Sequence, residues 1–198
     1  SMQRKSALYS APSVLLLVLI FAFLFVIYAQ KQQSLFTTEP RKILAVSIVI
    51  LLVFALANLV INQGPKLGLK SPGYLVPTAI ASIIITIITN VPLAILSTCI
   101  IGGLMAVSSG IGNPDSLEYF IVVLAGGIAA AISASHARRR RHLVIPGIYV
   151  SFTNLVTIIG LGILKDLTPL DLGTACLIGS VNGVIVALLT PGLLPVFE

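Results

Sequence analysis

About seven apolar stretches, separated by short polar connections, make up most of this 198-residue chain. No Asp, Glu, Lys or Arg lies deep inside a stretch, and most stretches reach the roughly 20 residues that a helix needs to cross a bilayer. Helices satisfy their own backbone hydrogen bonds in lipid, and the strict alternation of an outer-membrane barrel is absent. We therefore predict an all-α, polytopic integral membrane bundle of about seven transmembrane helices. They cover approximately residues 11–29, 43–61, 74–89, 92–111, 117–135, 143–164 and 172–194.

The composition agrees with a protein whose sides face lipid. Hydrophobic residues make up 57% of the chain and charged residues 9%, whereas soluble domains carry roughly 25% charged residues. The net charge of +6 does not indicate a nucleic-acid binder, because the basic residues form short runs and no broad patch with interleaved aromatic residues. The expected partner is the lipid bilayer and not a nucleic acid. Cys99 and Cys176 lie within apolar stretches and are predicted to be small buried side chains.

The two ends of the chain suggest a segment of a longer protein. Ser1-Met2 resembles a cloning remnant. Residues 1–10 are predicted to form an extracellular stub, and residues 11–198 to form the seven-helix membrane domain. The chain stops just after the last apolar stretch, so we expect it to have been excised from a larger protein.

The charged connections predict which side each one faces, because cytoplasmic loops retain Lys and Arg. The run Arg138, Arg139, Arg140 and Arg141 is the strongest marker and places its connection inside. Counting crossings from it adds Lys31, Arg41 and Lys42 to the inside, and leaves Lys66, Lys70 and Lys165 outside. The acids Asp115, Glu118, Asp166 and Asp171 fall outside as well. The N-terminus is thus predicted outside and the C-terminus inside.

The connection Asn90-Val91-Pro92 is very short, so the third and fourth stretches are predicted to form a helical hairpin over Tyr74–Ile111. The third stretch is also short, and the hairpin could either span the membrane or re-enter on one side. Both alternatives leave the two chain ends on the predicted sides. The arginine run has two further interpretations, which are contact with anionic lipid headgroups and docking of an acidic cytoplasmic domain.

Polar side chains within the last two stretches are the candidate functional residues, because each is costly in hydrocarbon. Ser151 and Asn154 lie three residues apart, and Asn182 lies between Gly179 and Gly183. Hydrogen bonding between helices would explain these residues, and so would a polar pocket or coupling network. The small residues favour close helix packing, with a glycine-lined ligand cavity as the alternative. Asn58 is a weaker candidate, and Asn90 is interpreted as a turn residue.

Several kinds of function are disfavoured. Ion-coupled transport usually needs a charged group at mid-membrane, and none is present there. The motifs of intramembrane proteases are absent. His136 and His142 flank the arginine run without further metal ligands nearby, so no metal or cofactor is expected in this chain.

A series of motifs resembles a known family in order and spacing. The run Ser71-Pro72-Gly73-Tyr74-Leu75-Val76-Pro77 is similar to that family's S-P-x-Y-L-I-P at the start of a membrane helix. The other matching features are Asn90-Val91-Pro92-Leu93-Ala94, Leu117-Glu118 before Gly126-Gly127, the basic loop, Asn154, and Asn182-Gly183 followed by Gly192-Leu193-Leu194-Pro195-Val196-Phe197-Glu198. The family is the seven-transmembrane receptors with an intracellular HD hydrolase, the PgpH-type cyclic-di-AMP phosphodiesterases of bacteria.

The resemblance implies an extracellular domain before the seven helices and a metal-dependent HD phosphodiesterase after them, in the bacterial inner membrane. The chain would then be a membrane anchor and signal-coupling domain with no catalytic residues of its own, and the divalent metal would belong to the HD domain. The implied partners are its own extracellular and HD domains, with a homodimer as a further expectation. The rival hypotheses are a small-molecule uptake module, such as the substrate-binding subunit of a vitamin transporter, and a purely structural anchor.

Overall fold

The computed structural model of the chain describes residues 40–110, 113, 115–136 and 144–197, together with positions 20, 23, 27 and 28. The described part is helical and contains no strand. Most of the first predicted stretch and the run Arg138–Arg141 lie outside it, so the predictions made for them remain predictions. The elements are α3 (Pro40–Gln63), η1 (Gly64–Leu67), η2 (Pro72–Leu75), α4 (Ala79–Ile88), α5 (Val91–Ser108), α6 (Ser116–Ala134), α7 (Val144–Leu164) and α8 (Pro169–Phe197).

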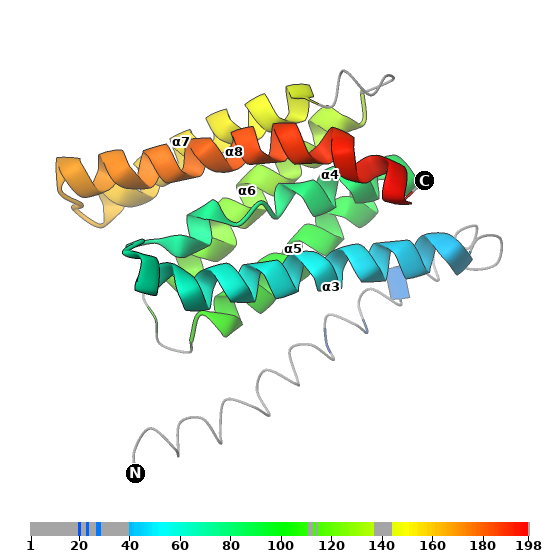
Figure 1. Cartoon of the computed structure of the whole chain (residues 1–198), viewed down its shortest axis with the longest axis horizontal. Coiled ribbons are helices and arrows are strands. Elements are labelled where there is room, and N and C mark those ends of the chain that lie inside the picture. Colours follow the sequence, from blue (N-terminus) through cyan, green and yellow to red (C-terminus); the bar gives the residue numbers. More distant parts are fainter. Residues whose placement is uncertain are drawn as a thin grey trace, which may run out of the picture.

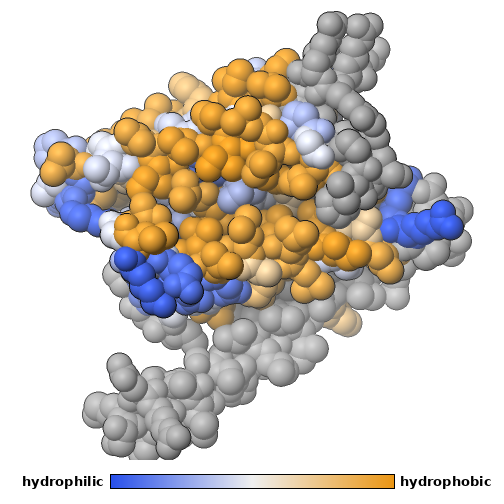
Figure 2. Space-filling view, viewed as in Figure 1, coloured by the Kyte–Doolittle hydropathy of each residue, from blue (hydrophilic) through white to orange (hydrophobic). Residues whose placement is uncertain are grey.

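The helices run roughly parallel to one long direction of the molecule (Figure 1). Five of them, α3, α5, α6, α7 and α8, are long and apolar enough to cross a membrane. Figure 2 shows a continuous apolar surface along the middle of the molecule, with hydrophilic residues gathered at its two ends. The prediction of a helical, multi-pass membrane protein is therefore confirmed. The total of seven crossings and the orientation of the chain ends are not tested by the described residues.

Helix α4 lies at the centre of the bundle, although it is the shortest of the α-helices described above. It contacts α3, α5, α6 and α8, and every residue from Ala79 to Thr86 is buried. A helix that is apolar on all sides is stable when other helices surround it completely. Its 10 residues extend only about 15 Å, half of a typical hydrocarbon core of about 30 Å. Helix α4 is therefore surrounded by other helices of the protein and not by lipid.

Helix α3 shows the opposite arrangement, with one face on the bundle and one outside it. Val46, Val49, Val53 and Ala57 are buried at the three- and four-residue spacing of a helix face. Large apolar side chains between them, such as Leu51 and Leu59, are more than 60% exposed. Exposed leucines of this kind suit contact with lipid chains and not with water.

Helices α7 and α8 approach each other very closely, as the small residues predict. Gly183 packs directly on the backbone of Ser151, and a Cβ atom at position 183 would lie 2.6 Å from Ser151 Cα. A Cβ atom at Gly179 would collide with the side chain of Ile158. The interpretation of Gly179 and Gly183 as sites of close helix packing is confirmed.

Candidate functional site

The residues that lead into α4 do not form a regular helix. Pro72 begins the short 3-10 helix η2, Val76 then adopts an extended conformation, and α4 begins only at Ala79. Pro77 explains part of this break, because proline has no N–H to donate to the carbonyl of Tyr74 three residues earlier. The next N–H, that of Thr78, donates instead to the carbonyl of Val76 at 2.8 Å. The third predicted stretch is thus a broken helix, and the predicted start near residue 74 was too early for α4.

Asn182 of α8 bonds to the break. Its Nδ2 atom donates to the backbone carbonyls of Tyr74 at 2.8 Å and Val76 at 2.9 Å. Both partners are acceptors, so the amide must present its nitrogen to them. Backbone carbonyls outside a regular helix are tolerated at membrane depth only where protein groups satisfy them. Asn182 therefore supplies a donor to the carbonyl of Tyr74 and a second donor to the carbonyl of Val76, which also accepts from Thr78.

Asn154 of α7 is almost completely buried and faces the same region. Its Nδ2 atom donates to the carbonyl of Gly179 on α8, at 3.4 Å. Its Oδ1 atom lies against Gly126 of α6, where a Cβ atom would come within 2.6 Å of it. Asn154 and Asn182 line one small internal cavity, together with Gly126 and Thr78. The structure thus brings together two of the three predicted polar residues.

Ser151 does not line this cavity. Its hydroxyl donates to the carbonyl of Ser180 at 2.8 Å and so joins α7 to α8. The other polar residues noted in the sequence also form local or interhelical bonds. Asn58 accepts a hydrogen bond from the hydroxyl of Ser108, and Asn90 accepts one from the N–H of Leu93 at 3.0 Å. Asn90 lies in the short connection between α4 and α5 and is the N-cap of α5.

A cluster of charged residues at one end of the bundle was not predicted. We call it the charged cluster; it consists of Lys70, Asp115, Glu118, Lys165 and Asp171, which line a cavity of about 170 Å³ together with Tyr74. Lys165 pairs with Asp115 at 2.9 Å and with Glu118. Lys70 pairs with Asp171 at 2.6 Å. The cluster joins the segment before η2 to the starts of α6 and α8 and to the connection between α7 and α8.

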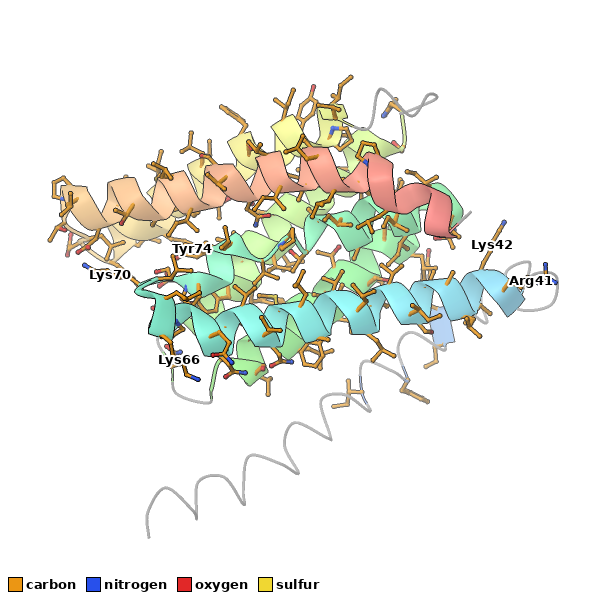
Figure 3. The ribbon with its side chains drawn as sticks, in the orientation of Figure 1. Arg41, Lys42, Lys66, Lys70 and Tyr74 are labelled. Carbon is orange, nitrogen blue, oxygen red and sulfur yellow. The ribbon has the colours of Figure 1, made fainter. Side chains whose placement is uncertain are left out.

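Tyr74 connects the charged cluster to the break. Its hydroxyl donates to Glu118 Oε2 at 2.5 Å, while its backbone carbonyl accepts from Asn182. Its ring meets that of Tyr119 edge to face, with 5.6 Å between ring centres. In Figure 3, Tyr74 and Lys70 lie at the end of the bundle opposite Arg41 and Lys42. Tyr74 therefore contacts two partners: the buried carboxylate of Glu118 at one end of the bundle, and Asn182 of α8 inside the bundle.

The carboxylates of the charged cluster differ in burial, and we expect the effects of removing them to differ. Glu118 is buried, so Glu118→Gln is expected to lower the free energy of unfolding by about 1–3 kcal/mol, because Lys165 and Tyr74 lose a charged partner. Asp171→Asn is the control: Lys70 is 77% exposed, and exposed ion pairs contribute little to stability, so a smaller loss is expected. Unfolding in mixed detergent micelles measures both. Equal losses would show that the burial of Glu118 does not strengthen its contacts with Lys165 and Tyr74.

The described residues contain no group of His, Cys, Asp and Glu that could hold a metal ion. Cys99 and Cys176 are both free thiols and partly buried.

These features define a multi-pass helical membrane domain with a buried broken helix at its centre. The chain belongs to the family of 7TM receptors with an intracellular HD hydrolase, which matches it over residues 8–198. It is 29% identical over 189 residues to the cyclic-di-AMP phosphodiesterase PgpH of Bacillus subtilis strain 168. That alignment covers 93% of this chain and 26% of the relative, so the chain spans about a quarter of the relative's length. No solved structure matches the chain.

Proposed function

We propose that this chain is the membrane-anchoring and signal-coupling domain of a bacterial cyclic-di-AMP phosphodiesterase. Membership of a family with an intracellular HD hydrolase supports this proposal, as does the likeness to a cyclic-di-AMP phosphodiesterase. The catalytic HD domain and its divalent metal would belong to the rest of the longer protein. The domain would lie in the cytoplasmic membrane and would act with its own extracellular and HD domains, as a homodimer.

The proposed orientation places the end with Arg41 and Lys42 in the cytoplasm. The start of α3 and the end of α8 share this end of the bundle (Figure 1). The connection that carries Arg138–Arg141 joins the end of α6 to the start of α7, which lie there too. This gathering of basic residues supports an inside location by the same rule that was applied to the sequence. The charged cluster would then face the outside.

The connection from Glu118 through Tyr74 to Asn182 is the observation that carries the coupling role. It joins the proposed outer face to α8, whose far end would continue into the HD domain. A displacement of the start of α6 would move Glu118, and with it Tyr74 and the carbonyls that Asn182 holds. Because α8 is a single helix from Pro169 to Phe197, a shift at Asn182 would reach its cytoplasmic end directly.

The test uses the full-length parent protein in membranes and measures cyclic-di-AMP hydrolysis. Tyr74→Phe removes the hydroxyl that contacts Glu118 and keeps the ring, so we expect a clear change in hydrolysis with unchanged expression. Tyr149→Phe is the matched control, since Tyr149 is 56% exposed on the lipid-facing surface, and should leave hydrolysis unchanged. Identical activity of all three proteins would support a purely structural anchor. No hydrolysis by the unaltered parent would contradict the phosphodiesterase assignment.

A further inference from the structure

The small cavity between α6, α7, α8 and the break contains two buried acceptors without donors. Asn154 is 1% exposed and Asn182 is 5% exposed. Neither Oδ1 atom has a hydrogen-bond partner among the described residues. Both amide nitrogens already donate to backbone carbonyls. Flipping the amide of Asn182 would take this donor away from the carbonyls of Tyr74 and Val76, so its Oδ1 atom stays directed away from them.

Buried acceptors of this kind normally have a partner, because leaving them unpaired loses the hydrogen bonds that they make in water. The cavity that both residues line measures about 10 Å³, which is about the space of one water molecule. A water molecule offers two O–H donors, which equals the number of unpaired oxygens. Thr78 lines the same cavity, and its hydroxyl is a further polar group that such a molecule could contact.

We propose that this cavity is a binding site for one ordered water molecule, which donates to Oδ1 of Asn154 and to Oδ1 of Asn182. The water would join α7 to α8. It would lie beside the break before α4, to which Asn182 also donates directly. This assignment does not depend on the proposed function, because it follows from burial, volume and donor–acceptor balance alone.

A metal cation fits the cavity less well than water. Hard cations take about six or more oxygen ligands, whereas two amide oxygens are unpaired here. No carboxylate is among the residues that line the cavity. A cation would therefore remain without a counter-charge at membrane depth, which is costly. An ammonium ion has the size of water but meets the same objection.

Radiolytic hydroxyl labelling of the intact chain in lipid nanodiscs tests the proposal, because radicals formed from bound water label the side chains beside it. Val150 lines the cavity and is 1% exposed. Val46 and Val186 are equally buried valines, at 1% and 0%, outside this cavity. We expect several-fold more labelling of Val150 than of these two controls. Equal labelling of the three valines would overturn the proposal.

A variant and a change of salt complete the test. Asn154→Leu removes one acceptor and should reduce the labelling of Val150 to the level of Val186. If this variant does not fold, the comparison of valines in the unaltered protein still decides. Replacing sodium chloride by choline chloride should leave the thermal midpoint unchanged. A lower midpoint in the absence of sodium would overturn the assignment to water in favour of a cation.

Discussion

Replacing Asn182 by leucine is expected to lower the free energy of unfolding by about 1–3 kcal/mol, because the buried carbonyl of Tyr74 loses its donor. The carbonyl of Val76 keeps its bond from the N–H of Thr78. Leucine has a similar length, so the main change is the loss of the two bonds to the carbonyls of Tyr74 and Val76. Pro77 cannot replace the lost donor, because it has no N–H. Equilibrium unfolding of the purified chain in mixed detergent micelles measures the loss.

Two further variants make this expectation specific. Asn182→Asp keeps the shape but places an oxygen where the donor was, and it should destabilise the chain at least as much as leucine. Asn58→Leu removes an interhelical bond to Ser108 from a half-buried position, where such a bond contributes about 0.6–2 kcal/mol. If Asn182→Leu costs no more than Asn58→Leu, Asn182 does not hold the break together.

A single methyl group at Gly183 is expected to destabilise the bundle by about 1–3 kcal/mol or more, the usual effect of overpacking. A Cβ atom there would lie 2.6 Å from the Cα atom of Ser151. Because the obstacle includes backbone atoms, no side-chain rotation can relieve the contact. Helices α7 and α8 would have to separate, and the hydrogen bond from Ser151 to Ser180 would lengthen. The thermal midpoint of Gly183→Ala in detergent micelles measures the effect.

Gly173→Ala on the same helix is the matched control. No atom lies within 4 Å of a Cβ atom built at Gly173, and alanine favours a helix over glycine by about 1 kcal/mol. The control should therefore raise the midpoint or leave it unchanged, while Gly183→Ala lowers it. A similar response at both positions would mean that α7 and α8 are not in close contact at Gly183.

The helices themselves could be predicted from the sequence because their apolar runs and polar connections alternate so clearly. Five predicted stretches correspond to α3, α5, α6, α7 and α8 within a few residues. The third stretch was different, since its apolar run continues through the break and hydropathy does not register a change in backbone conformation. Pro77 was visible as part of a motif, but its effect depends on which donor replaces its missing N–H.

The candidate site was predictable only in part, because its contacts join distant residues. The polar side chains of Asn154 and Asn182 could be identified by their cost in hydrocarbon. Asn182 bonds to backbone carbonyls that are 106 and 108 residues away, and backbone acceptors carry no residue-specific signal. The charged residues were assigned to one side of the membrane by counting crossings. Their pairing was not predictable, since Lys70 and Asp171 are 101 residues apart.

The distance in sequence between Asn182 and the break has a consequence for synthesis. Asn182 follows Tyr74 by 108 residues, which a ribosome adds in about 5–20 s at roughly 5–20 residues per second. During this interval the nascent chain already contains the break, but not the amide that completes it. Helix α4, at the centre of the bundle, is thus made well before α8, which completes its enclosure. Until α8 is made, the carbonyl of Tyr74 in the break needs another donor, such as water.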